Sequence, residues 1–139
     1  MDFAIIAGTF QKMEATTKRT ELTALLVELI KNTPNEIIAK AVYLLQGILK
    51  PSFEGLELGI AEKLAIRAIA KSSGVSVKKI QNEYNVGGDL GDTASNILKH
   101  KTQTTFIVEP ITLERVYDTL LKIANLEGKG SQDLKIKYI

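Results

Sequence analysis

Two stretches with helical periodicity meet at Gly87-Gly88-Asp89-Leu90-Gly91-Asp92, and this turn decides the fold class. Glycine commonly ends a helix in the left-handed conformation, and aspartate is a preferred N-cap for the helix that follows. A similar turn is Glu127-Gly128-Lys129-Gly130-Ser131-Gln132-Asp133, and a looser version is Glu57-Leu58-Gly59-Ile60-Ala61-Glu62-Lys63. The recurring unit is therefore a helix, a glycine turn and another helix.

Apolar residues recur at the spacing of an α-helix along almost the whole chain. The pattern predicts an all-α, compact multi-helix domain with about eight or more helices, near residues 3–13, 18–30, 34–47, 60–71, 76–86, 90–99, 113–126 and from 131 onward. Alternation typical of a strand is confined to residues 106–108. Four side chains are expected to cap helix N-termini, namely Thr33, Asp89, Thr112 and Ser131.

Length and composition indicate one ordinary globular domain over residues 1–139. Hydrophobic residues make up 45% of the chain, charged residues make up 24%, and cysteine is absent. No apolar run is long enough to span a membrane, and the start lacks the basic region of a signal peptide. We expect a cytoplasmic, nucleoid-associated monomer. The chain stops within a helical pattern at Ile139, which suggests a domain cut from a longer protein.

The charge distribution points only weakly to nucleic acid, since the net charge is +2. Residues 1–56 contain six basic and six acidic residues, whereas residues 57–139 contain twelve and ten. Asp89 and Asp92 are carboxylates close together in sequence, and both fit helix-start roles better than metal binding. The single histidine, His100, lies in a basic polar stretch where exposure is expected. No nucleophile–base set or phosphate-binding loop of the nucleotide-hydrolase type is present, so we predict no catalytic residue and no metal site.

The glycine turns allow two interpretations that are compatible with each other. In the structural one, glycines end helices and the neighbouring polar residues start the next. In the functional one, glycine lets the backbone approach a phosphate closely, and a fresh helix start offers unpaired N–H groups and a positive dipole end. Doubled glycines with Lys129 and Lys135 beside them favour phosphate binding along a nucleic-acid backbone.

The segment Gln103-Thr104-Thr105-Phe106-Ile107 also has two interpretations. Phe106 could anchor a surface loop onto the core, or the segment could dock into a pocket of a partner protein. The sequence leaves both open.

Taken together, an ordered set of motifs resembles the N-terminal DNA-binding domain of archaeal and eukaryotic ATP-dependent DNA ligases, the archaeal form more closely. The resemblance covers essentially the whole chain and rests on Thr17-Lys18-Arg19-Thr20-Glu21-Leu22, Glu57-Leu58-Gly59-Ile60-Ala61-Glu62-Lys63, Gly88-Asp89-Leu90-Gly91, Leu113-Glu114-Arg115-Val116-Tyr117 and Glu127-Gly128-Lys129-Gly130-Ser131-Gln132-Asp133-Leu134-Lys135. It implies an all-helical domain that holds the backbone of nicked duplex DNA across the minor groove. It also implies catalytic domains downstream, which require ATP and Mg²⁺ and act in DNA replication, repair and recombination.

On this basis we expect the chain to bind nicked double-stranded DNA independently of sequence. We expect that it does not ligate DNA by itself and that it holds no cofactor. The residues expected to contribute are Arg19, Gly59, Lys63, Gly88, Leu90, Gly91, Lys101, Gly128, Lys129, Gly130, Ser131 and Lys135. The alternative is a protein-interaction module. In some archaeal relatives the loop before the Pro-x-Thr helix binds the sliding clamp PCNA, and Gln103, Phe106 and Ile107 are similar to that motif, with Ile107 in place of a second aromatic residue.

Overall fold

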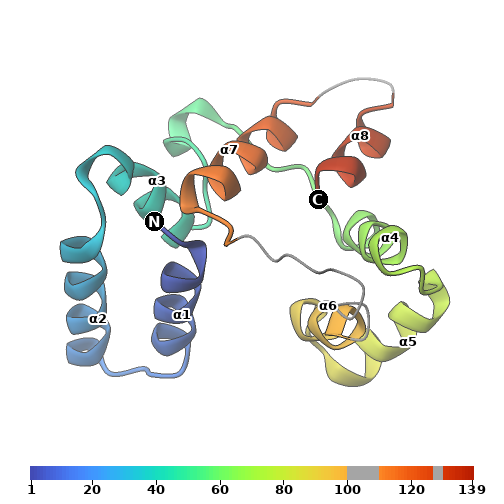
Figure 1. Ribbon diagram of the computed structural model, residues 1–139, viewed down its shortest axis with the longest axis horizontal. Helices are drawn as coiled ribbons and strands as arrows, with labels where there is room; N and C mark the ends of the chain where they lie inside the picture. The colour runs from blue at the N-terminus through green and yellow to red at the C-terminus, as the bar shows by residue number, and fades with distance from the viewer. Residues whose placement is uncertain (100–109, 127–129) are drawn as a thin grey trace. The chain divides into compact units, whose positions relative to one another are not determined.

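The computed structural model describes residues 1–99, 110–126 and 130–139, and these form eight α-helices and two short 3-10 helices (Figure 1). The predicted all-α fold is confirmed. Within the described ranges, extended pairing is limited to an isolated bridge between Asp2 and Thr112. No helix in the described part of the chain is long and apolar enough to cross a membrane.

The chain forms two compact units. Unit 1 comprises Met1–Leu58 and Glu109–Asn125, and unit 2 comprises Gly59–Val108 and Leu126–Ile139. The single domain predicted over residues 1–139 stays a prediction, because two compact units can belong to one domain or to two.

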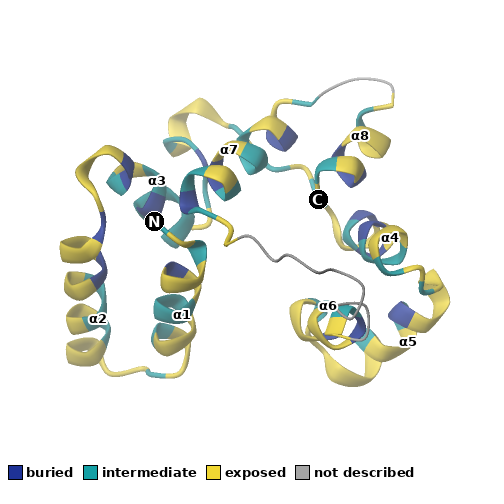
Figure 2. Ribbon diagram, in the orientation of Figure 1, coloured by how far each residue is buried: buried dark blue, intermediate teal, exposed yellow. Residues whose placement is uncertain are grey.

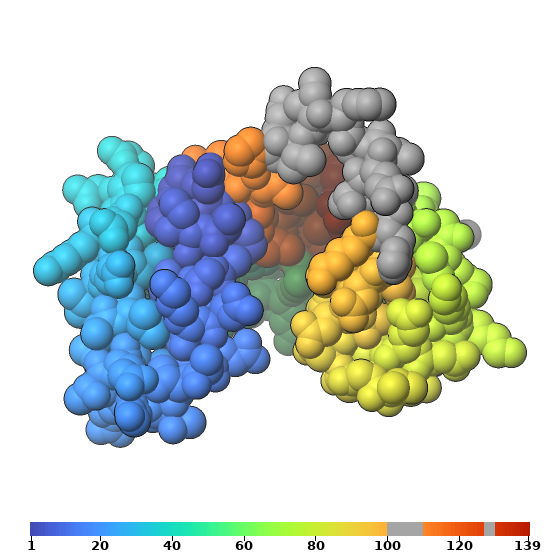
Figure 3. All heavy atoms as spheres, turned by 60° about the horizontal axis from the view of Figure 1, so that its bottom comes forward, coloured from blue at the N-terminus to red at the C-terminus, as the bar shows by residue number. Residues whose placement is uncertain are grey.

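Unit 1 contains four α-helices and both 3-10 helices, which are α1 (Phe3–Glu14), α2 (Arg19–Asn32), η1 (Asn35–Ile37), α3 (Ile38–Leu45), η2 (Ser52–Glu54) and α7 (Leu113–Ala124). Helices α1 and α2 pack against each other as two adjacent columns (Figures 1 and 3). Helix α7 contributes to both apolar clusters of the unit, through Leu113 in one and through Tyr117 and Ala124 in the other. The Tyr117 hydroxyl donates a hydrogen bond to the Leu49 carbonyl, which satisfies this buried polar group.

Unit 2 contains α4 (Glu62–Ser73), α5 (Val77–Gly87), α6 (Leu90–Lys99) and α8 (Ser131–Tyr138), and α4 is its central helix. Leu64 and Ala68 of α4 pack with Ile136 of α8. Ile66 is two residues from both Leu64 and Ala68, hence on a different side of the helix, and packs with buried side chains of α5 and α6. Helix α4 is therefore covered on two sides, and its remaining face is exposed (Figure 2).

Two of the four predicted N-caps are confirmed. The Asp89 carboxylate accepts a hydrogen bond from the Asp92 N–H at 2.8 Å, and the Thr112 hydroxyl accepts one from the Arg115 N–H at 3.2 Å. Each bond satisfies an N–H group that the helix itself cannot use.

The other two N-caps were wrong. Thr33 is buried and its hydroxyl donates to the Leu29 carbonyl at 2.6 Å, so it closes α2 instead of opening α3. The chain then forms η1 before α3 begins at Ile38. At the last turn Gly130 occupies the N-cap position, and Ser131 is the first residue of α8.

Candidate nucleic-acid interface

The basic residues are unequally divided between the units. By sequence, unit 1 has eight Lys and Arg against ten Asp and Glu, and unit 2 has ten against six. The side-chain charges are therefore −2 for unit 1 and +4 for unit 2. An anionic partner is expected to be attracted to unit 2.

Within unit 2, the exposed face of α4 carries a row of three cations, Lys63, Arg67 and Lys71. They follow one another at a spacing of four residues, so they lie on one side of the helix and the row is about 12 Å long. Two other sides of the helix are anchored, one by the packing of Leu64 and Ala68 and the other by the packing of Ile66. The row is thus held on a helix whose orientation within unit 2 is set by the core.

Arg67 faces a cavity of about 310 Å³ lined by Arg67, Lys71, Val77, Asp133 and Ile136. One guanidinium nitrogen of Arg67 lies 3.2 Å from a carboxylate oxygen of Asp133, which is in the first turn of α8. The two side chains are 48% and 82% exposed. Lys71 forms no ion pair with any described residue, so the three charged groups of the cavity sum to one positive charge.

The turn before α4 is held from α8. Gly59 has a φ of +68°, and the buried Lys135 side chain donates from Nζ to the Gly59 carbonyl at 3.3 Å. A Cβ on residue 59 would lie 2.5 Å from that nitrogen, and the positive φ disfavours any other residue. Lys135 therefore supports the turn in this structure.

The helix starts of unit 2 fall into two kinds. The N-termini of α5 and α6 are capped by the side chains of Ser76 and Asp89. Those of α4 and α8 follow Ala61 and Gly130, and neither has a side-chain cap. Gly130 has a φ of +82°, and apart from its chain neighbours and its own helix no described residue has an atom within 4 Å of where its Cβ would lie, which leaves room among the described residues for a backbone to approach this start closely. The two uncapped starts belong to the predicted turns at residues 57–63 and 127–133.

In the third predicted turn, between α5 and α6, the Asp89 carboxylate already occupies the start of α6. A Cβ on Gly91 would lie 3.2 Å from the Asp89 carboxylate that caps α6. Leu90 is half-buried and packs against the cluster of Ile66, Ile80 and Ile97, while Gly88 ends α5 by donating to the Tyr84 carbonyl at 2.7 Å. The described contacts of these residues are structural.

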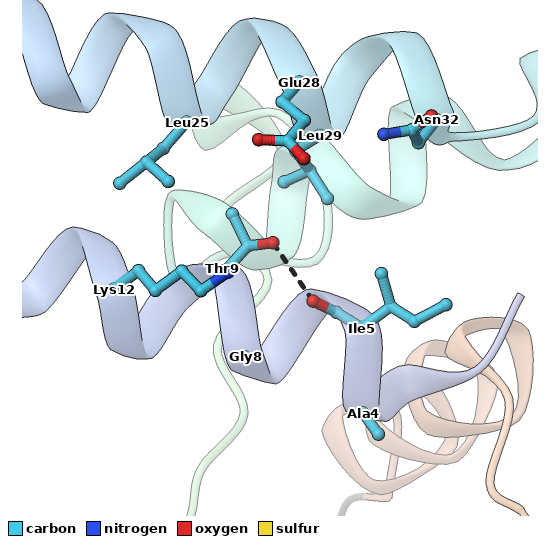
Figure 4. A pocket seen from close by; sticks show the side chains of 9 residues that line it. All are labelled: Ala4, Ile5, Gly8, Thr9, Lys12, Leu25, Glu28, Leu29 and Asn32. Atoms are coloured by element: carbon cyan, nitrogen blue, oxygen red, sulfur yellow. Dashed lines mark hydrogen bonds between the residues drawn. The ribbon is translucent and has the colours of Figure 1, made fainter.

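Unit 1 offers a different surface. Arg19 is exposed at the start of α2. A groove of about 300 Å³ lies between α1 and α2, where Figure 4 shows Ile5, Leu25 and Leu29 together with Lys12 and Glu28. The charges in this groove are mixed, so it lacks the cationic character of the α4 face.

Six predicted site residues lie outside the described residues, namely Lys101, Gln103, Phe106, Ile107, Gly128 and Lys129. Clamp docking through the 103–107 segment therefore stays a prediction. Sequence reasoning missed Arg67 and Lys71, although the signal was present. Basic residues at positions 63, 67 and 71 on the polar side of a strongly amphipathic helix mark a single face.

Comparison with known proteins identifies relatives across the whole chain. Residues 2–139 match the family described as DNA ligase N terminus. The chain is 67% identical over 139 residues to a DNA ligase of Nitrosopumilus maritimus and 58% identical to one of Cenarchaeum symbiosum. It is 38% identical to a DNA ligase of Thermococcus fumicolans. All of the chain is covered in each case, but it spans only about a quarter of the length of these curated relatives (24%, 24% and 25%).

Proposed function

This chain belongs to the family of DNA ligase N-terminal regions, and from that premise we propose that it binds double-stranded DNA at nicks, through the phosphate backbone flanking the minor groove. The observation that carries the proposal is the row of Lys63, Arg67 and Lys71 on the exposed face of α4. Cations held on one rigid face can neutralise several phosphates at once, and this term dominates affinity for DNA.

The proposed contacts fix the position of the protein without reading bases. Arg67 suits phosphate because its guanidinium donates to two oxygens at once, and Lys63 and Lys71 add point charges. The uncapped starts of α4 and α8 supply backbone N–H groups to neighbouring phosphates. Lys135 contributes indirectly, because its hydrogen bond to the Gly59 carbonyl holds the turn before α4.

The parent protein is proposed to be an ATP- and Mg²⁺-dependent ligase that joins nicks during DNA replication, repair and recombination, located in the cytoplasm at the nucleoid. In this scheme the present chain holds the DNA, and the remaining three quarters of the protein carries out the chemistry. We therefore expect the 139-residue chain alone to bind DNA and to leave nicks unjoined.

The test is a salt series. Fluorescence anisotropy would give Kd for a nicked duplex and for an intact duplex of the same sequence at several salt concentrations. For the wild-type chain we expect Kd to rise steeply with salt and to vary little with sequence. Replacing Lys63, Arg67 and Lys71 together with glutamine should raise Kd on the order of 100-fold and lower the slope of log Kd against log salt by about 2–3.

The matched control removes the same three charges from exposed positions of unit 1, by replacing Lys12, Lys31 and Arg115 with glutamine. We expect this variant to bind within a few-fold of wild type. Equal losses in both triple variants would show that only net charge matters. Absence of salt-sensitive binding by the wild-type chain at low salt would refute the proposed function itself.

A further inference from the structure

The ion pair between Arg67 and Asp133 places an acidic group at the centre of the cationic face of unit 2. The Arg67 side chain is about half exposed and the Asp133 side chain mostly exposed, so the pair is not required to satisfy a buried charge. The cavity beside it is also lined by Lys71, and its apolar wall is made of Val77 and Ile136. The cavity of about 310 Å³ and its surplus positive charge can receive one more anion.

We propose that this cavity is a phosphate-binding subsite in which Asp133 takes the place of a DNA phosphate until DNA binds. The proposal rests on the proposed function and adds to it a single exchange, in which a backbone phosphate displaces the carboxylate from Arg67. Carboxylate and phosphate oxygens both match the paired donors of a guanidinium, so one can replace the other on the same group.

The exchange is favourable in the presence of DNA because a phosphate on Arg67 can also contact Lys71, whereas the released Asp133 carboxylate is solvated by water. Lys71 lines the same cavity and is available to a phosphate that already contacts Arg67. The Asp133 side chain is 82% exposed and can turn into water, where its charge is well solvated. An exposed ion pair is weak, so displacement should reduce DNA affinity only about two- to fivefold relative to an unmasked Arg67.

The experiment is a double-mutant cycle on the complete 139-residue chain, with Kd for a nicked duplex measured at one low salt concentration. The variants of the cycle are Asp133→Asn, Arg67→Gln and the two combined, and Lys71→Gln is a separate test of the cavity. Glu62→Gln is the matched control, because Glu62 is an exposed acid on α4 that forms no ion pair with a described residue. The melting temperature of each variant would show whether its fold is kept.

We expect Asp133→Asn to lower Kd about two- to fivefold, more than Glu62→Gln does, and to have no effect when Arg67 is already glutamine. If Asp133→Asn acts like Glu62→Gln, or acts equally with and without Arg67, Asp133 contributes only net charge and the exchange is wrong. If the wild-type chain binds DNA while Arg67→Gln and Lys71→Gln bind equally well, the subsite and the role of these two cations are wrong, and DNA binding by the chain still stands. If neither the wild-type chain nor any variant binds DNA, both fail.

Discussion

The two units use the same type of secondary structure but distribute charge differently. In unit 1 the described ion pairs of Lys18 and Lys40 use acids of the same unit, Glu21 and Asp118, and acids outnumber bases. In unit 2 bases outnumber acids, and two of the three cations on α4 form no ion pair with a described residue. The net charge of +2 for the chain is therefore the sum of a negative unit 1 and a positive unit 2. The net charge of a small protein is therefore informative about its partners only after its compact units are known.

The largest expected effect tests whether the units are separate in stability. Ile80 of unit 2 and Ile6 of unit 1 are both 0% exposed, so replacing either one with alanine makes a comparable change in the core of its unit. We expect Ile80→Ala or Ile6→Ala to lower the free energy of unfolding of its own unit by about 2–5 kcal/mol. Hydrogen exchange followed by mass spectrometry should show faster exchange in α4–α6 for the first variant and in α1 and α7 for the second. Equal acceleration in both units after either change would mean that the chain unfolds as one body.

The next effect tests whether the functional difference follows the charge difference. Lys71→Glu reverses a charge on the α4 face, and Lys31→Glu makes the same change at an exposed position on α2. We expect a rise in Kd for duplex DNA of about tenfold or more for Lys71→Glu, and of about twofold for Lys31→Glu. Anisotropy titrations at one salt concentration would measure both. A larger loss for the unit 1 variant would locate the interface elsewhere.

A smaller effect concerns the side-chain N-caps of helices, which occur in both units. Ser76 caps α5 in unit 2 with an oxygen 3.3 Å from the Lys79 N–H, and Thr112 caps α7 in unit 1. Alanine at either position should cost about 1 kcal/mol, because one N–H of the first turn loses its partner. Urea unfolding curves would measure the change. A loss for Ser76→Ala that also raised Kd for DNA would show that the cap positions α5 for binding.

The smallest effect compares two ion pairs, both between described residues, that join helices distant in sequence. Lys40 and Asp118 lie 2.9 Å apart with Lys40 31% exposed, whereas Arg67 and Asp133 lie 3.2 Å apart with Arg67 48% exposed. We expect Asp118→Asn to lower stability more than Asp133→Asn does, each by less than about 1 kcal/mol. Melting curves at low and high salt would measure this. The reverse order would indicate that the pair in unit 2 is primarily structural, which would weaken the proposed exchange.

Local signals predicted the helices well and their starts less well. The Gly88 helix end and the Asp89 and Thr112 caps follow from residues within four positions of each other. Thr33 fits the same rule in sequence but is buried against α2, where its hydroxyl bonds back to Leu29. The capping rule could not anticipate this, because a threonine can bond forward or backward and burial decides between them.

The candidate site was predicted in part. The turns at Gly59 and Gly130 were identified from glycine spacing, and both precede helix starts without a side-chain cap. Lys135 was expected among the phosphate contacts, and the structure places it in the core of unit 2 against the Gly59 carbonyl. Arg67 and Lys71 were missed: their spacing from Lys63 marks one face of the helix, but only the packing of α4 shows that this face stays uncovered.

By itself the sequence determined the all-α class, the order of the helices and most of their ends, because periodicity, glycine turns and caps act over three to five residues. Only the tertiary structure decided which residues share a surface. The contact of Lys135 with Gly59 joins positions 76 residues apart, and that of Arg67 with Asp133 joins positions 66 residues apart. Such pairs form only when α4 and α8 pack through Leu64, Ala68 and Ile136, so the cationic face exists as a consequence of the core.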